Sequence, residues 1–171
     1  MKTPHEYLDQ VCLIARRAGQ EIMEIYDNHE FEIEYKEDKS PVTIADLKSD
    51  AFITEQLHIL SPDIPVLSEE TSSEHPYRER KQWQCYWLVD PLDGTKGFIN
   101  KNDFFTVNIA LIDNNISVLG VVYAPAMKQL FYATRDHGAF RQEQDSEPSK
   151  ISVCKQPRAK PIVAVSRAHI N

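Results

Sequence analysis

The sequence predicts an α+β fold, in which two helices pack on a largely antiparallel sheet. Two segments with apolar residues at helical spacing lie within the first 60 residues, and short apolar segments separated by turn residues follow them. These apolar segments come one after another along the chain. We therefore expect hairpin connections between them rather than alternating βαβ units.

The two helices are predicted over residues 4–27 and 43–60. Thr3-Pro4-His5-Glu6 has the pattern of a capping box with proline at the first helical position. Thr43 is the expected N-cap of the second helix. In the first segment apolar residues recur at helical spacing, so this helix is expected to bury one face. Leu47, Ala51, Phe52 and Leu57 mark the second helix.

The sheet is expected to form from short apolar or alternating segments. Strands are predicted at residues 31–35, 65–68, 85–89, 106–112, 117–123, 129–133, 151–154 and 161–165. Asp113-Asn114-Asn115 is a hairpin-type turn, residues 36–41 form a polar turn, and residues 70–82 form a loop or a short surface helix. Because a polar break at 143–149 precedes the last two segments, residues 1–150 are interpreted as one α+β domain carrying the site. Residues 151–171 are interpreted as the first strands of a second domain.

Charge and composition exclude several classes of function. The 171 residues include 19 Lys and Arg and 26 Asp and Glu, which gives a net charge of −7. Binding to a nucleic acid polymer needs a basic face that this balance does not supply, whereas a small phosphorylated ligand can be held through divalent cations. No apolar run approaches the ~18 residues of a membrane span. Three separated cysteines without a CxxC pair indicate a reducing compartment, so a cytoplasmic location is expected, with peripheral inner-membrane association left open.

The densest group of chemically useful residues follows the predicted strand 85–89. The strand is expected to end at Asp90, and Asp93 comes three residues later, so both carboxylates can converge on one hard cation together with the Leu92 carbonyl. Such all-oxygen ligands suit Mg²⁺. A helix that begins directly after this turn would add free backbone N–H groups for a phosphate.

These residue types also allow simpler readings. The segment Asp90–Thr95 consists of residues that favour turns, so a purely structural turn stays open at this point. Glu69-Glu70 has the pattern of a solvated surface pair, and Asp46 that of an acid near a helix N-terminus. A haloacid-dehalogenase-type phosphatase is disfavoured, because Pro91 stands where that family has its nucleophilic aspartate. The six histidines show no spacing typical of a zinc site or of a Ser-His-Asp triad.

Three motifs in register resemble the inositol monophosphatase superfamily: Ser40–Asp46, Leu67–Glu70 and Trp87–Thr95. The similarity continues through Phe105–Leu111 and Gly120–Pro125 and covers essentially the whole chain. The segments Asp90–Lys96, Val107–Leu111 and Ser166–His169 are most similar to the 3′(2′),5′-bisphosphate nucleotidase branch, whose members remove the 3′-phosphate of adenosine 3′,5′-bisphosphate.

The resemblance implies a metal site with two or three Mg²⁺ ions and inhibition by Li⁺. Glu69, Asp90 and the Leu92 carbonyl would hold the first ion, and Asp90 and Asp93 the second. The substrate would be a small phosphorylated molecule, a nucleotide bisphosphate, and a homodimer is left open.

The remaining roles implied by the resemblance concern water and phosphate. Thr95, hydrogen-bonded to Asp46, would orient and help to deprotonate the attacking water, and Glu70 would hold a further water. Gly94 and Thr95 would give backbone N–H groups to the phosphate. The implied substrate-binding set is Glu69, Leu92, Asp93, Gly94 and Thr95.

Two departures from the family pattern shape the final interpretation. Gly97 stands where the nucleotidase branch usually has an acidic residue, and the family's later W-D-x-A-A-type motif, whose aspartate completes the second metal site, is absent from the sequence. We therefore expect the amino-terminal domain of a Mg²⁺-dependent bisphosphate nucleotidase-like phosphatase with little turnover by itself. An inositol monophosphatase-like phosphatase and a catalytically impaired metal-binding fragment remain as alternatives.

Overall fold

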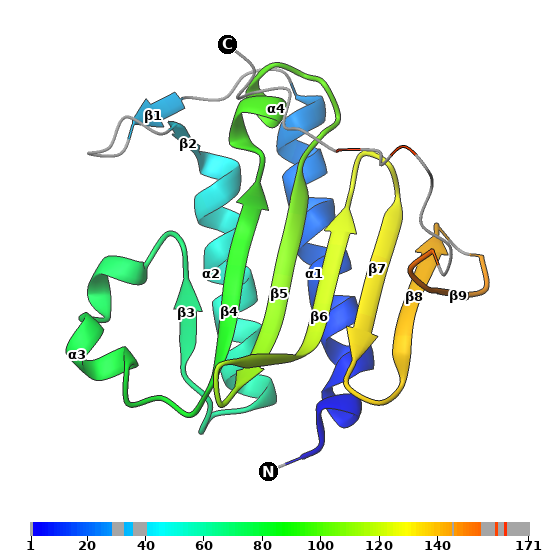
Figure 1. The fold of residues 1–171 in the computed structure, drawn as a ribbon. Coiled ribbons are helices and arrows are strands. Elements are labelled where there is room, and N and C mark those ends of the chain that lie inside the picture. The colour runs from blue at the N-terminus through cyan, green and yellow to red at the C-terminus, as the bar shows by residue number, and fades with distance from the viewer. Residues whose placement is uncertain are drawn as a thin grey trace.

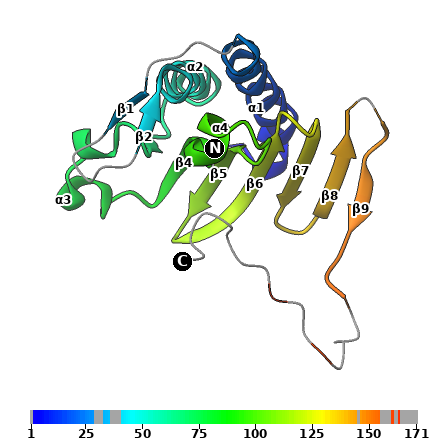
Figure 2. The same ribbon diagram turned by 90° about the horizontal axis from the view of Figure 1, so that it is seen from above.

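Two long helices and a seven-stranded sheet form the body of the molecule (Figure 1). The computed structural model describes residues 2–28, 33–35, 41–144, 146–154, 160 and 163. Helix α1 (Pro4–Asp27) and helix α2 (Ile44–Leu60) lie side by side on one face of the sheet, as the view from above shows (Figure 2). This arrangement confirms the predicted α+β class.

Both helices begin at the residues that their capping patterns predict. The backbone N–H and the hydroxyl of Thr3 donate to the Glu6 carboxylate over 2.7 and 2.8 Å, so both donors have a partner at the start of α1. At the start of α2, the Thr43 hydroxyl accepts the Ala45 N–H over 3.2 Å. Among the described residues, no helix combines the length and the apolar character that a membrane crossing requires.

The sheet has a simple order, because most strands pair with their sequence neighbours. Its strands are β3 (Val66–Ser68), β4 (Cys85–Asp93), β5 (Thr106–Asp113), β6 (Ile116–Ala124), β7 (Gln129–Thr134), β8 (Gly138–Glu143) and β9 (Ser149–Ile151), in that order across the sheet. The β3–β4 pair is parallel, and the pairs from β4 to β9 are antiparallel. The largely antiparallel sheet is therefore confirmed.

The shorter elements connect these layers at their ends. Strands β1 (Ile33–Tyr35) and β2 (Pro41–Thr43) form a separate antiparallel pair before α2. A 3₁₀ turn (Ser72–Glu74) and helix α3 (Tyr77–Arg80) lie between β3 and β4, within the segment predicted as a loop or short helix. Helix α4 (Thr95–Ile99) directly follows β4.

The core lies between the two helices and the sheet. Side chains on alternate positions of the central strands, such as Trp87, Val107 and Ile109, are almost fully buried against the helices. The Trp87 indole N–H donates to the Ser61 hydroxyl over 2.8 Å, so its polar atom stays satisfied within the core. The opposite face of the sheet is more open: Leu88 is 42% exposed and Val122 is 39% exposed.

The structure differs from the sequence prediction at two strands. Strand β8 was not predicted, because it carries few apolar side chains and is held by pairing with β7 and β9. Strand β9 begins earlier than the predicted segment 151–154 and crosses the predicted domain boundary. The predicted strand 161–165 and turn 36–41 lie almost wholly outside the described residues, as do Phe31 and Glu32 at the start of the predicted strand 31–35.

Asn114 and Asn115 have φ of 48° and 64°, which confirms the hairpin turn.

Two glycines offer a matched test of close backbone packing. A Cβ at Gly97 would overlap the Phe104 carbonyl oxygen and lie 2.8 Å from Asn102 Oδ1, whereas a Cβ at Gly120 would meet no atom within 4 Å. We predict that Gly97→Ala lowers the free energy of unfolding by about 1–3 kcal/mol, because the loop must move. Gly120→Ala is expected to be neutral or slightly stabilising.

Urea denaturation of both variants beside the parent chain measures the difference. Equal stability of the two variants would show that the loop at residues 102–104 moves away from residue 97 without any loss of stability. That result would contradict the prediction.

Candidate functional site

Two parallel strands bring three acidic residues together at the end of the sheet where both strands finish. Because β3 and β4 are parallel, Glu69 at the end of β3 lies beside the last residues of β4. The Glu69 backbone N–H donates to the Val89 carbonyl over 3.0 Å and holds this alignment one residue beyond β3. Asp90 and Asp93 are among the last four residues of β4. Helix α4 follows this end of the strand (Figure 1).

Strand β4 does not end at Asp90 as predicted but continues to Asp93 through a bulge. Asp90 pairs with Asn108 and Asp93 with Thr106, so two residues of β4 lie opposite one residue of β5. Pro91 lies in this bulge and has no N–H to donate to the sheet, which favours the irregularity. The extra residue places Asp90 and Asp93 on the same face of the sheet, although they are three residues apart.

The environment of Asp90 is unfavourable for an unneutralised negative charge. Burial, followed by the carboxylates of Glu69 and Asp93, raises the pKa of Asp90 from its ordinary 3.8 to about 7, with a smaller contribution from Glu70. A hydrogen bond from the Leu92 backbone opposes this rise in pKa. The Asp90 Oδ1 atom is buried and has no hydrogen-bond partner. A cation would relieve both the repulsion and the missing contact.

Asp46 links the start of α2 to the start of α4. Its Oδ2 accepts the Thr43 hydroxyl over 2.6 Å and the Thr43 N–H over 2.8 Å, while its Oδ1 accepts the Thr95 hydroxyl over 3.1 Å. Asp46 is 1% exposed, and this burial raises the pKa of its carboxyl against the effect of its hydrogen bonds. The structure thus places the predicted residues Asp46 and Thr95 in direct contact.

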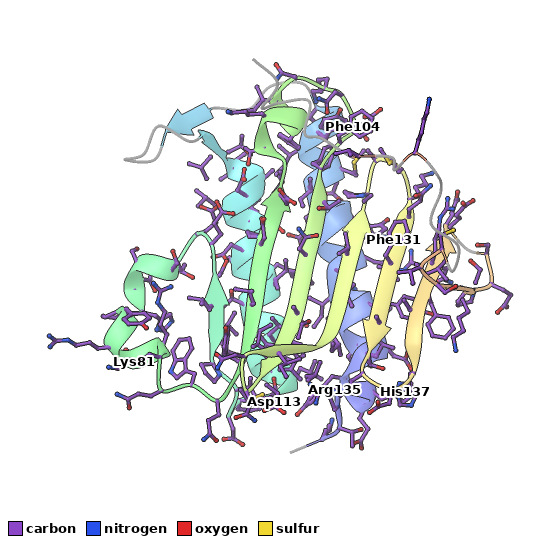
Figure 3. All side chains as sticks on the ribbon, viewed as in Figure 1. Lys81, Phe104, Asp113, Phe131, Arg135 and His137 are labelled. Carbon is purple, nitrogen blue, oxygen red and sulfur yellow. The ribbon has the colours of Figure 1, made fainter. Side chains whose placement is uncertain are left out.

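Gly94 allows the turn from β4 into α4. Its φ of 94° lies in the left-handed region, and a Cβ there would lie 2.7 Å from the Phe104 carbonyl oxygen. Phe104 itself lies at the end of the sheet that carries α4 (Figure 3). A larger residue at position 94 would therefore displace both the turn and the loop that packs on it, so Gly94 positions Thr95.

Two residues near the site were not predicted from the sequence. Asn108 Nδ2 donates to Asp93 Oδ2 over 3.2 Å, and its Oδ1 accepts the Thr106 hydroxyl over 3.0 Å. The buried Ser49 hydroxyl donates to the Pro91 carbonyl over 2.8 Å, which ties α2 to the bulge. Ser49 follows Asp46 by three residues and so shares its helix face, a signal that the sequence does contain. Asn108 is identified only once the strand register is known.

The candidate ligand atoms are of the chemical type that a hard divalent cation prefers. Glu69, Asp90, Asp93 and the Leu92 carbonyl supply oxygen atoms only, and one of these oxygens is buried without a partner. In the part of the chain that the structure describes, no group of three or more His, Cys, Asp or Glu side chains is already arranged to hold a metal ion. The carboxylates of Glu69 and Asp93 both raise the pKa of Asp90, so the three groups interact electrostatically at this end of the sheet.

Known proteins similar to this chain include a curated nucleotidase and two solved structures. The 3′(2′),5′-bisphosphate nucleotidase CysQ of Salmonella typhimurium is 48% identical over 163 residues, which are 95% of this chain and 64% of that protein. The structure of CysQ from Bacteroides thetaiotaomicron matches with a TM-score of 0.63 and 39% identity, over 81% of this chain and 50% of that one. The extragenic suppressor protein suhB from Bartonella henselae matches with a TM-score of 0.70 and 29% identity, over 85% and 54% of the two chains.

The comparison with protein families agrees with these matches. The sequence pattern of the inositol monophosphatase family matches residues 4–170. The chain spans 64% of the length of its curated relative and about half the length of the two solved structures. On this evidence the chain belongs to the inositol monophosphatase family.

Proposed function

We propose that this chain is the metal-binding part of a Mg²⁺-dependent phosphomonoesterase that removes a phosphate from nucleoside 3′,5′-bisphosphates. The observation that carries this proposal is Asp90, a half-buried carboxylate between Glu69 and Asp93 with one oxygen lacking a partner. The choice of a bisphosphate substrate is supported by the 48% identity to a protein named as a 3′(2′),5′-bisphosphate nucleotidase.

Each acidic residue has a proposed role in holding cations. Glu69, Asp90 and the Leu92 carbonyl would hold one Mg²⁺ ion, and Asp90 and Asp93 a second, as the family resemblance implies. When bound, Mg²⁺ supplies positive charge that activates water and stabilises the negative charge that develops on the phosphate. The Asn108 amide restrains Asp93 through its hydrogen bond, which limits the rotamers available to that carboxylate.

The Asp46–Thr95 pair is proposed to move a proton from the attacking water. The Thr95 hydroxyl donates to Asp46 Oδ1, so its oxygen lone pairs remain available to accept a hydrogen bond from water. Burial raises the pKa of Asp46, and a raised pKa makes a carboxylate a better proton acceptor. Thr43 donates twice to Asp46 and fixes its orientation during this transfer.

The start of α4 is proposed to hold the phosphate. The first N–H groups of a helix have no partner within the helix, and those of Gly94 and Thr95 follow Asp93 directly in the chain. Glu70 is proposed to hold a further water near Asp90, on whose pKa it acts. Inhibition by Li⁺, a cytoplasmic location, the homodimer and the domain division near residue 150 stay predictions.

The raised pKa of Asp90 predicts how stability depends on pH. With a pKa of about 7 in the folded chain and 3.8 ordinarily, the folded state holds the proton more tightly, so stability falls as pH rises between about 4 and 7. Asp90→Asn removes the charge. We predict that it raises the melting temperature of the metal-free chain at pH 8, with little effect at pH 4, where Asp90 is protonated.

Thermal unfolding with and without Mg²⁺ measures this effect, because each kcal/mol of stability shifts the melting temperature by ~2–4 °C. At pH 8, saturating Mg²⁺ should make the parent chain melt at a higher temperature than Asp90→Asn, because only the parent chain gains a full ligand set. The control is Asp63→Asn, an exposed aspartate before β3 at the opposite end of that strand. An Asp90→Asn variant that behaves like this control at both pH values would contradict the electrostatic account.

Phosphate release under single-turnover conditions tests the reaction itself. We expect the parent chain to release phosphate from adenosine 3′,5′-bisphosphate in a Mg²⁺-dependent way and faster than from inositol 1-phosphate. Asp90→Asn should slow this release by ~100-fold or more, the size typical of losing one preorganised electrostatic partner. Preference for the inositol ester would refute the nucleotide assignment, and release that does not depend on Mg²⁺ or Asp90 would refute the proposed site.

A further inference from the structure

The connection between α4 and β5, residues 100–105, folds back onto α4. The Asn102 N–H donates to the Gly97 carbonyl over 3.1 Å. The Phe104 carbonyl oxygen lies so close to both Gly94 and Gly97 that a Cβ at either position would overlap it. The backbone of this connection therefore packs directly against α4.

Two residues of the connection have backbone angles in the left-handed region. The φ angle of Lys101 is 53° and that of Asp103 is 64°. Aspartate tolerates this region because its short polar side chain can hydrogen-bond locally, whereas lysine has no such compensation. A conformation of this kind persists where surrounding contacts hold it in place.

Tyr26, in the last turn of α1, contacts both of these residues. Its hydroxyl donates to Asp103 Oδ1 over 2.9 Å and accepts the Asp103 N–H over 3.2 Å. Its carbonyl oxygen accepts a hydrogen bond from the Lys101 ammonium, whose nitrogen lies 3.9 Å from the centre of the Tyr26 ring. One residue of α1 thus holds the two left-handed residues of the connection.

The Tyr26 ring also packs against both ends of the connection. Its centre lies 5.2 Å from the ring centre of Phe98 in α4 and 4.9 Å from that of Phe105, directly before β5. All three rings are buried, at the end of the molecule that carries α4 (Figure 1). Helix α4 is therefore held from α1 by Tyr26 and from α2 by the hydrogen bond between Thr95 and Asp46.

We propose that Tyr26 is a positioning residue, which holds α4 so that the Thr95 hydroxyl stays directed at Asp46. The inference rests on the proposed function, because it takes Thr95 and Asp46 as the pair that moves the proton. Tyr26 acts through Asp103 and Phe98 and needs no contact with the substrate. Removing its hydroxyl alone should loosen α4, while the ring still fills its place in the core.

Amide hydrogen exchange in the metal-free chain measures how firmly α4 is held. The amides of Phe98 and Asn102 donate to the carbonyls of Gly94 and Gly97, so their exchange reports on α4 and on the connection. Tyr26→Phe should speed exchange at both amides by about 10-fold, the size of a typical hydrogen bond. The amides of β5 that pair with β6 should keep their exchange rates.

Tyr7→Phe is the matched control for this substitution. Tyr7 is a buried tyrosine near the other end of α1, and its ring packs at 5.7 Å from that of Trp87. The same hydroxyl is removed from the same helix, but far from α4 along the chain. Exchange in α4 should therefore match that of the parent chain.

Substitutions at Asp103 test the partner of the Tyr26 hydroxyl. Asp103→Gly removes the acceptor and suits the left-handed backbone, so it should speed exchange in α4 as Tyr26→Phe does. Combining the two substitutions should add little, because both break the same hydrogen bond. Asp103→Asn keeps an acceptor oxygen and tolerates the backbone angle, so it should restore the protection.

Single-turnover phosphate release then separates positioning from a purely stabilising role. The substrate is adenosine 3′,5′-bisphosphate at saturating Mg²⁺, well below the melting temperature of every variant. Tyr26→Phe and Asp103→Gly should slow release roughly 10-fold, because small displacements of reacting groups are costly. Asp103→Asn and Tyr7→Phe should stay near the parent rate. A contact that only stabilises the fold would leave the rate of the folded molecules unchanged.

Either of two results would overturn the proposal. One is unchanged exchange in α4, or an equal rise in exchange throughout the sheet, in Tyr26→Phe. The other is faster exchange confined to α4 with an unchanged rate of phosphate release. Failure of the proposed function has a different signature, because the parent chain itself would then show no Mg²⁺-dependent release. In that case the exchange measurement still decides whether Tyr26 holds α4.

Discussion

Electrostatic repulsion around Asp90 is the constraint on which the arrangement of the site depends. Parallel pairing of β3 with β4 brings Glu69 to this aspartate, and the bulge at Pro91 brings Asp93 to the same face of the sheet. Burial raises the pKa of Asp90, and both carboxylates raise it further. Holding these groups together reduces the stability of the metal-free chain, so the fold stores an unfavourable interaction that a divalent cation would relieve.

Rigid contacts around the acidic residues keep them from moving apart freely. The Ser49 hydroxyl ties the bulge to α2, and the Asp46–Thr95 hydrogen bond ties α4 to the same helix. Gly94 lets the backbone turn beneath Phe104, where a side chain would not fit. Because α2 contacts both the bulge and α4, one rigid helix sets the relative positions of the proposed metal ligands and of the proposed proton acceptor. This is the preorganisation that electrostatic catalysis requires.

Much of the fold and part of the site could be predicted from the sequence, for identifiable physical reasons. Capping residues mark the starts of α1 and α2, and apolar segments mark the central strands, because these signals are local. Strand β8 depends on its neighbours for stability, and the bulge depends on which residue of β5 lies opposite Asp90, so neither has a local signal. Asn108 contacts Asp93 through the register of the sheet, so its role becomes apparent only in three dimensions.

The central claim is that the carboxylates at the ends of β3 and β4 share a divalent cation. Anomalous X-ray scattering from crystals of the chain soaked in Mn²⁺, a hard cation with the same preference for oxygen ligands, tests it most directly. The account predicts a manganese peak in contact with Asp90 and with Glu69 or Asp93, which is absent in crystals of Asp90→Asn. Manganese bound only elsewhere, or a peak that persists in the variant, would contradict it.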